Sequence, residues 1–175
     1  FMNKTIGWVV LVLAVVGIIW WASSKPVVAP VDENGSTISM KVGVVLPLTG
    51  NFGLLGERMK GGFELAKEDI LKTGKMGSID LVFEDACQPK EATSAAQKLI
   101  NIDKVDLLGG SFCVIGFVPM VPIFEQAKLV TFTTASGPDS VLNKKYIVST
   151  QASIKEKATE IANYAYTKLG ARTAA

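Results

Sequence analysis

Residues 41–66 read KVGVVLPLTGNFGLLGERMKGGFELA, and this stretch decides the fold. Its first six residues, KVGVVL, form a short apolar run rich in valine, which is typical of a strand buried on both faces. Pro47 and the glycines after it end the run. Apolar residues then recur at spacings of three and four, as on one face of an amphipathic helix: Leu55, Met59, Phe63, Ala66 and Ile70. A buried strand therefore leads into a helix.

The rest of the chain repeats this alternation. Further buried strands are expected at residues 79–84, 105–108, 129–134 and 146–149. A helix that begins near Pro89, where the missing N–H costs little, has an apolar face formed by Ala92, Ala95, Ala96, Leu99 and Ile100. A short helix distorted by Pro119 and Pro122 is expected next. A last helix has an apolar face formed by Ile154, Ala158, Ile161, Ala162, Ala165 and Leu169. This order predicts an α/β fold, a doubly wound parallel sheet with right-handed crossovers.

Ligands of such sheets bind beyond the carboxyl ends of the strands. The loops expected there are residues 47–56, 85–90, 109–117 and 133–141. The glycines of the first loop match neither a dinucleotide fingerprint nor a phosphate-binding loop, so they indicate either a turn at a ligand cleft or a purely structural turn. Ser111 lies outside a GxSxG motif, which leaves a hydrolase unsupported. Asp85 is expected to cap a local turn. Its neighbour Glu84 should point to the opposite face of the strand.

The composition excludes several classes of function. With 49% hydrophobic and 19% charged residues, the 175-residue chain is too apolar for a disordered protein. Lys and Arg number 18 and Asp and Glu 16, so no nucleic-acid partner is expected. The absence of histidine removes Ser-His-Asp and Cys-His catalysis and the zinc sites that need imidazole. We therefore expect no catalytic residue, no metal and no cofactor.

The N-terminus predicts export. Residues 6–22 read IGWVVLVLAVVGIIWWA, carry no charge and follow Lys4, which favours translocation of what comes after them. Their length lies between that of a secretory signal and that of a transmembrane helix. Ala22 and Ser24 permit a cleavage site, whereas the pair Trp20–Trp21 suits a membrane interface. Both a cleaved signal peptide and a membrane-inserted anchor stay open, and the anchor is slightly favoured.

Three parts follow from these patterns. Residues 1–22 are a signal anchor or signal peptide, residues 23–39 are a linker with two prolines, and residues 40–175 are the folded domain. The chain stops after a predicted helix, where a further strand should begin. We expect it to be part of a longer protein.

The two cysteines follow neighbouring predicted strands. Cys87 comes after the second strand and Cys113 after the third, so both loops lie at one edge of the sheet. A disulfide is the usual outcome for such a pair in an exported protein. The alternative, a nucleophilic Cys113, lacks a histidine to activate it.

Four segments resemble the type I periplasmic substrate-binding proteins, the leucine/isoleucine/valine-binding group of ABC importers. They are residues 41–66, quoted above, FEDACQPKEATSAAQKLI (83–100), LLGGSFCVIGFVPMVPIFE (107–125) and LVTFTTASGPDSVL (129–142). The spacing of Cys87 and Cys113 is similar to that of the family's disulfide. The resemblance covers residues 40–175 and implies most of the first lobe of a two-lobe fold, preceded here by one hydrophobic helix.

The resemblance also implies a mechanism and a ligand site. Two lobes would close on a small polar ligand, such as a branched-chain amino acid, and the closed form would dock on a membrane permease. The ligand carboxylate would meet the loop after Cys113 and the turn at Ala135 and Ser136, where amides and a hydroxyl suit an anion. Leu55 takes the place of an aromatic wall. Val114 replaces a usual serine, and this loss of a hydroxyl favours a less polar ligand or binding by main-chain groups.

The leading hypothesis is an extracytoplasmic solute-binding protein of an ABC importer with no catalytic activity, anchored to the cytoplasmic membrane by its N-terminal helix. The alternative is a ligand-sensing ectodomain of a signalling receptor with the same fold. A third hypothesis, an exported hydrolase, lacks its histidine and its nucleophile motif in this sequence.

Overall fold

The computed structural model describes residue 31 and residues 37–173. The predicted hydrophobic segment 6–22 and most of the predicted linker lie outside the described residues. Within residues 37–173, no helix has both the length and the apolar character needed to cross a membrane.

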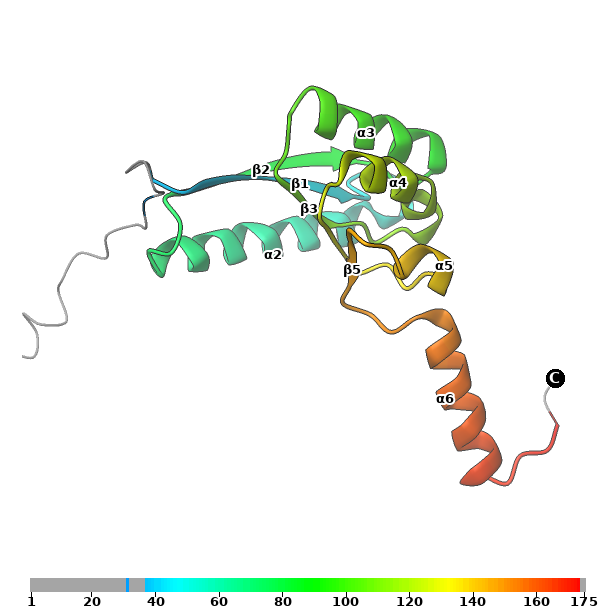
Figure 1. The fold of residues 1–175 in the computed structure, drawn as a ribbon. Helices are drawn as coiled ribbons and strands as arrows, with labels where there is room; N and C mark the ends of the chain where they lie inside the picture. The colour runs from blue at the N-terminus through cyan, green and yellow to red at the C-terminus, as the bar shows by residue number, and fades with distance from the viewer. Residues whose placement is uncertain (1–30, 32–36, 174–175) are drawn as a thin grey trace, which may run out of the picture.

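Five parallel strands form one sheet in the order β2-β1-β3-β4-β5 (Figure 1). Their bounds are β1 Ser39–Leu46, β2 Ser78–Asp85, β3 Leu107–Gly110, β4 Thr131–Thr133 and β5 Ile147–Ser149. The helical segments are η1 Gly50–Phe52, α2 Gly53–Lys72, α3 Pro89–Asn101, α4 Val114–Ala127, α5 Asp139–Leu142 and α6 Ile154–Thr167. The predicted α/β class and the doubly wound parallel sheet are confirmed.

Two hydrophobic clusters lie on the two faces of the sheet. Helices α3 and α4 cover one face, where Leu99, Phe117 and Phe124 are buried with Val45 and Leu108 of the strands. On the other face, α2 packs over Val42, Val44 and Leu46 of β1. Figure 1 shows α3 and α2 on opposite sides of the sheet, as double winding requires.

The packed face of α2 differs in part from the predicted one. Met59 and Phe63 pack against the strands as predicted, but Leu55, Ala66 and Ile70 are exposed. Gly56 and Leu71 complete the packed side instead. At Gly56 the helix approaches the carbonyl oxygen of Pro47 so closely that a Cβ would lie 2.0 Å from it. This backbone contact fixes the rotation of α2 about its own axis. The periodicity of apolar residues alone does not reveal that rotation.

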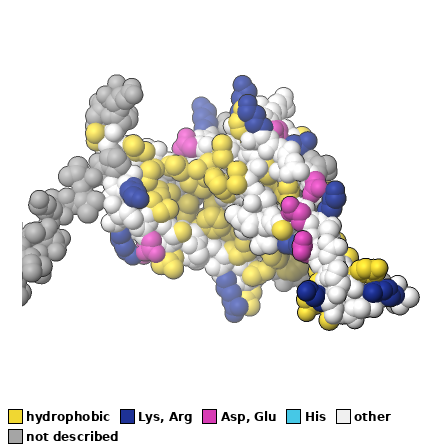
Figure 2. All heavy atoms as spheres, turned by 60° about the horizontal axis from the view of Figure 1, so that its bottom comes forward, with side chains coloured by type: hydrophobic (Ala, Val, Ile, Leu, Met, Phe, Trp, Pro, Cys, Tyr) yellow, Lys and Arg dark blue, Asp and Glu magenta, His cyan; other side chains and the backbone are white. Residues whose placement is uncertain are grey.

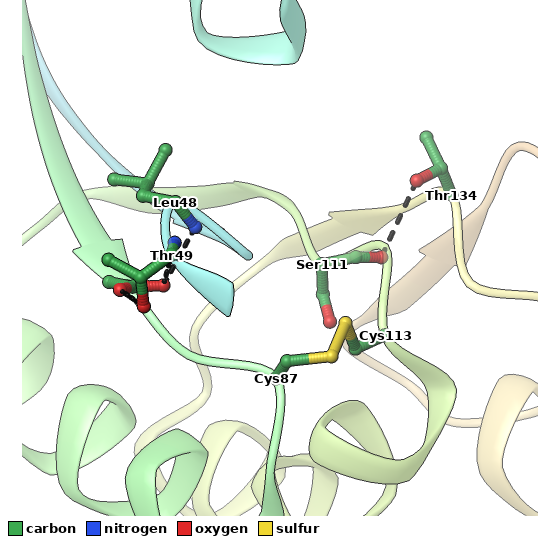
Figure 3. Close-up of a disulfide and its surroundings, with 7 residues drawn as sticks. Leu48, Thr49, Cys87, Ser111, Cys113 and Thr134 are labelled. Atoms are coloured by element: carbon green, nitrogen blue, oxygen red, sulfur yellow. Dashed lines mark hydrogen bonds between the residues drawn. A yellow bond between two sulfur atoms is a disulfide. The ribbon is translucent and has the colours of Figure 1, made fainter. Parts of the chain in front are cut away.

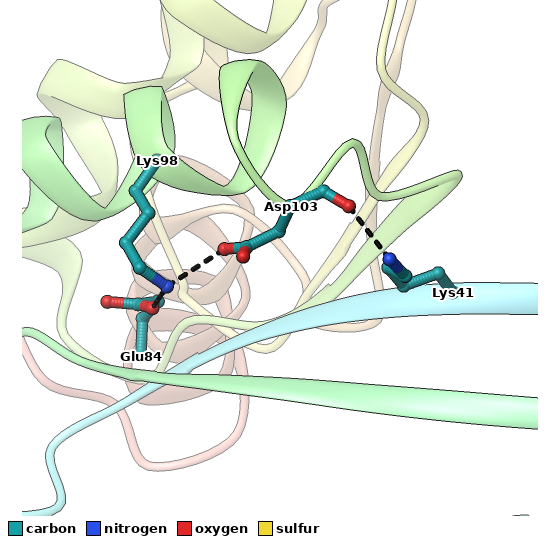
Figure 4. A network of polar contacts seen from close by, with 4 residues as sticks. All are labelled: Lys41, Glu84, Lys98 and Asp103. Carbon is teal, nitrogen blue, oxygen red and sulfur yellow. Dashed lines mark hydrogen bonds and ion pairs between the residues drawn. The ribbon is translucent and has the colours of Figure 1, made fainter.

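Helix α3 agrees with the sequence analysis. It begins at Pro89, and four of its five predicted core residues are buried while Ile100 is partly buried. Lys98 Nζ of this helix donates to the carboxylates of Glu84, on β2, and of Asp103 (Figure 4). The backbone carbonyl oxygen of Asp103 accepts a further hydrogen bond from Lys41 Nζ. The hydrogen bonds to Glu84 and then Asp103 raise the pKa of Lys98. The two hydrogen bonds of the charged Lys98 therefore stabilise the folded state at any pH below the usual lysine pKa. This stabilisation is lost as the pH rises from the usual lysine pKa through the raised pKa of Lys98.

Helix α4 runs through both of its prolines. A short distorted helix was expected, but α4 spans 14 residues with Pro119 and Pro122 inside it. Each internal proline removes a hydrogen bond at a cost of about 3 kcal/mol. The burial of Phe117, Met120 and Phe124 offsets this cost.

Helix α6 forms where it was predicted but does not pack as predicted. Ser153 and Glu156 make a reciprocal capping box at its start. None of its residues is buried, and the helix extends away from the sheet in Figure 1. The short helix α5 was not predicted, because residues 139–142 contain no helical period long enough to detect.

The sheet face beside α2 is bare over β4 and β5. Val130, Phe132 and Val148 are each about two-fifths exposed, whereas the alternate residues Thr131 and Ile147 are buried on the opposite face. Hydrophobic side chains gather across the middle of this side of the molecule in Figure 2. Helix α2 therefore covers only part of its face of the sheet.

Packing of α4 against α3 generates a prediction. A Cβ on Gly116 would lie 2.6 Å from the carbonyl oxygen of Cys87 and 3.3 Å from Ala92 Cβ, so Gly116→Ala is expected to lower the free energy of unfolding by about 1–3 kcal/mol. The control is Gly61→Ala on α2, where a Cβ meets nothing within 4 Å and stabilisation by about 0.5–1 kcal/mol is expected. Urea denaturation measures both; equal stabilities of the two variants would contradict this packing.

Candidate ligand-binding site

The carboxyl ends of the strands form one edge of the sheet, and the order of the strands creates a crevice there. From β1 the chain moves outward to β2, and from β2 it crosses back to β3 on the other side of β1. The loops after β1 and β3 therefore diverge toward opposite faces of the sheet. In doubly wound sheets this switch point is where ligands bind.

Asp85 holds the first of these loops. Its carboxylate accepts hydrogen bonds from the backbone N–H of Leu48 at 2.7 Å and of Thr49 at 3.2 Å, and from the Thr49 hydroxyl (Figure 3). The end of β2 is thereby tied to the loop after β1. The expectation that Asp85 stabilises a turn is confirmed. Glu84 contacts Lys98 instead, so the two adjacent carboxylates do not act together.

The second loop has an unusual backbone. Gly110 and Ser111 have φ angles of 101° and 64°, in the left-handed region that costs Ser111 some strain. The strain is offset by hydrogen bonds on both sides of the residue. The Ser111 N–H donates to Val45 O at 2.9 Å, and its carbonyl oxygen accepts from the hydroxyls of Thr133 and Thr134 at 3.3 and 3.4 Å (Figure 3). The loop is thus fixed to β1 on one side and to the end of β4 on the other.

A disulfide joins Cys87 to Cys113, as predicted, with 5.2 Å between the two Cα atoms (Figure 3). Cys113 is the residue that precedes α4, so the bond fixes the first turn of that helix at the edge of the sheet. Because the sulfur of Cys113 is engaged and the residue is buried, the alternative of a nucleophilic thiol is excluded.

All five residues expected to contact a ligand lie at this edge. Leu55 is in the first turn of α2 and is 38% exposed, and Cys113 and Val114 lie at the start of α4. Ala135 and Ser136 follow β4. Two segments diverge at the switch point. One leads into α2 and carries Leu55, and the other leads into α4 and carries Cys113 and Val114. Their roles as ligand contacts stay predictions.

In the turn after β4, Ala135 and Ser136 differ in the polar groups that they expose. The Ala135 side chain is buried and its N–H donates to Thr133 Oγ1 at 3.0 Å. Ser136 is half-buried, and its hydroxyl donates to the carbonyl oxygen of Ala152 at 2.9 Å. That hydroxyl keeps its oxygen lone pairs for a further contact. Ser136 is therefore the better polar candidate of the two.

Two residues at the switch point were missed by the sequence analysis. Phe52 ends η1 after β1, and Phe112 lies between β3 and α4; their ring centroids are 6.0 Å apart in an edge-to-face arrangement. Both rings lie within the loops expected to follow strands. Sequence spacing gave no signal that they meet.

The described residues also contain a cavity of about 430 Å³ on the helical side of the molecule. It is lined by Val118, Val121, Pro122, Glu125, Val141 and Lys144. None of these residues belongs to the switch-point loops that carry the candidate site.

Comparison with known proteins identifies this architecture. A family model described as periplasmic binding protein matches residues 39–175, almost all of the described chain. The chain belongs to the periplasmic binding protein family. The predicted membership is thereby confirmed.

Two relatives from Pseudomonas aeruginosa indicate the part of the family concerned. An amino acid binding protein is 34% identical over 59% of this chain, and a leucine-, isoleucine-, valine-, threonine- and alanine-binding protein is 27% identical over 62%. These alignments cover 28% and 30% of the relatives, so the chain spans about three tenths of their length.

Solved periplasmic binding proteins share the fold. A leucine binding protein of Thermotoga maritima has a TM-score of 0.64 and 27% identity, over 75% of this chain and 38% of that one. An ABC-transporter solute binding protein of Rhodopseudomonas palustris, solved with 3,4-dihydroxybenzoic acid, has a TM-score of 0.63 and 27% identity, over 73% and 36%.

Removal of the disulfide is expected to destabilise this domain of the binding protein. The bond closes a loop with a sequence separation of 26 residues, for which the chain-entropy account gives about 3.5 kcal/mol. The double variant Cys87→Ala, Cys113→Ala should lose about 2–4 kcal/mol of unfolding free energy in urea denaturation.

A reductant provides the control for this measurement. It should lower the stability of the wild-type protein and leave the double variant unchanged. Peptide mapping without reduction should recover Cys87 linked to Cys113, and two free thiols in exported protein would contradict the assignment.

Proposed function

We propose that this chain contributes one lobe of an extracytoplasmic solute-binding protein that serves an ABC importer. Family membership supports the proposal, and the single observation that carries it in the structure is the switch point between β1 and β3. There, Asp85 holds the loop after β1 and the disulfide holds the loop after β3, both at the carboxyl edge of the sheet. The loops carry no catalytic group, and the proposed role is binding without chemistry.

The ligand would be a small molecule with a carboxylate. The first turn of α4 presents backbone N–H groups after Cys113, whose side chain makes no capping hydrogen bond at that helix start. The Ser136 hydroxyl, which donates to the Ala152 carbonyl oxygen in this structure, would rotate to donate its proton to the ligand carboxylate. Leu55 would supply an apolar contact from the start of α2. Amides and hydroxyls suffice for a carboxylate without a full positive charge. Named ligands of the similar proteins, leucine and 3,4-dihydroxybenzoic acid, both carry a carboxylate.

Val114 distinguishes this site from one that offers a side-chain hydroxyl at the start of α4. An isopropyl group there makes no hydrogen bond, so ligand recognition at this point falls to the main chain. Ala135 would line the turn beside Ser136 without donating to the ligand, since its side chain is buried and its N–H already donates to Thr133 Oγ1. The site would therefore accept ligands less polar than a free amino acid.

Closure and docking would follow the general behaviour of two-lobed binding proteins. A ligand held between two lobes stabilises the closed form, and a permease in the membrane recognises that form. The hydrophobic segment 6–22 would direct export and, if uncleaved, keep the protein at the cytoplasmic membrane.

A thermal-shift screen of the full-length protein tests the proposal. Amino acids, short amides and aromatic acids make up the panel, and a ligand at 100 times its Kd should raise the free energy of unfolding by about 2.7 kcal/mol. Stabilisation by at least one carboxylate is the expected result. Failure of every carboxylate in the panel would contradict a carboxylate-binding role.

The role of Ser136 is tested by Ser136→Ala in the same protein. Loss of a hydrogen bond to a charged ligand group should lower affinity roughly tenfold or more in titration calorimetry. Ser94→Ala on α3 is the matched control, because that hydroxyl also donates to a backbone carbonyl, at Lys90, but lies away from the carboxyl edge. Equal affinities of the two variants would show that Ser136 only stabilises its turn.

A further inference from the structure

An aromatic pair bridges the switch point. Phe52 belongs to the loop after β1 and Phe112 to the loop after β3, and their rings meet edge to face at 6.0 Å with 63° between the ring planes. The rings are nonetheless 50% and 38% exposed. Both rings lie at the crevice that the strand order creates. Because they are this exposed, each ring has surface available for a further contact.

Exposed apolar side chains also begin the helix that follows each of the two loops. Leu55, in the first turn of α2, is 38% exposed, and Ile115, in the first turn of α4, is 56% exposed. Phe52, Leu55, Phe112 and Ile115 thus form an apolar rim, with two members from each of the diverging loops. A ligand at this rim gains by placing an apolar group against it.

Ionisable side chains are missing from the same loops. Residues 47–56, 109–117 and 133–138, which follow β1, β3 and β4, contain no Asp, Glu, Lys or Arg. Asp85, at the end of β2, uses its carboxylate to hold Leu48 and Thr49. These loops therefore offer amides, hydroxyls and apolar surface, which suit a carboxylate and a ring but supply no free carboxylate to an ammonium group.

We propose that this site takes a small carboxylate that carries an aromatic ring, and that Phe52 and Phe112 determine this specificity by contacting the ring. The inference rests on the proposed solute-binding function. A third ring can pack against the faces or edges that the pair leaves open, since aromatic rings favour offset-stacked and edge-to-face contacts. An aliphatic group of the same size on the ligand would occupy the same space beside Phe52 and Phe112, but it lacks the geometric preference that aromatic rings have for each other.

Three probes separate the contributions: benzoate, cyclohexanecarboxylate and leucine. In titration calorimetry of the full-length protein, benzoate should bind about tenfold more tightly than cyclohexanecarboxylate, which has the same carboxylate and nearly the same size. Benzoate should also bind more tightly than leucine. This comparison needs no substitution, so it does not depend on how a variant folds.

Variants then assign the preference to the pair. Phe52→Leu and Phe112→Leu keep an apolar side chain and should each reduce the preference for benzoate over cyclohexanecarboxylate by about five- to tenfold. Phe112→Tyr keeps a ring and should preserve it. The matched control is Leu65→Ala on α2, an exposed apolar residue outside the loops, which should leave both affinities unchanged.

The outcomes are distinguishable. Tighter binding of leucine than of benzoate, or no difference between benzoate and cyclohexanecarboxylate, overturns the aromatic specificity and leaves the solute-binding function standing. An unchanged preference in both leucine variants overturns the assignment to Phe52 and Phe112. Failure of every probe and of every carboxylate in the wider thermal-shift panel overturns the carboxylate-binding role, and failure of every compound in that panel overturns the solute-binding function itself.

Discussion

The covalent bond between Cys87 and Cys113 is the constraint on which the candidate site depends. It fixes the loop after β2 to the residue that precedes α4, and the missing side chain of Gly116 lets the first turn of α4 lie against the Cys87 carbonyl. A bond and a steric fit therefore hold the amides of that turn at the carboxyl edge of the sheet. Groups fixed in this way lose little conformational entropy when they receive a ligand.

Hydrogen bonds extend this rigid framework to the neighbouring loops. Asp85 joins the end of β2 to the loop after β1, and the Ser111 carbonyl joins the loop after β3 to Thr133 and Thr134. The Ser111 N–H also donates to Val45 O, and the Thr150 N–H donates to Thr133 O, so hydrogen bonds link all five strand ends in the order of the sheet. Phe52 and Phe112 meet across this framework without forming part of it.

Most of the fold could be predicted from the sequence because strand and helix periods are local. The periodicity of 92–100 identified the buried side of α3, and Cys87 and Cys113 were correctly paired. The two cysteines do not follow neighbouring strands as expected, because β1 lies between β2 and β3 in the sheet, and the bond spans the end of β1. What failed depends on contacts between distant segments. The rotation of α2 is fixed by the approach of Gly56 to Pro47, and α4 continues through Pro119 because its neighbours bury it. For the same reason, the sequence could assign the five expected ligand contacts to the carboxyl edge, where they remain predictions, but could not bring Phe52 to Phe112.

This separation of roles explains how one framework can accept different ligands. The residues that hold the edge act through backbone groups, a disulfide and the Asp85 carboxylate, and none of them needs a particular side chain at positions 52, 55, 112 or 114. The side chains at positions 52, 55 and 112 are exposed and carry little of the fold, whereas Val114 also packs against the core. Here all four are apolar, and the loops around them contain no ionisable group. Neutral donors can hold a carboxylate but distinguish poorly between one carboxylate and another. In the proposed site, selection among carboxylates comes from contacts with the apolar rim of Phe52, Leu55, Phe112 and Ile115, where burial contributes about 25 cal/mol per Å².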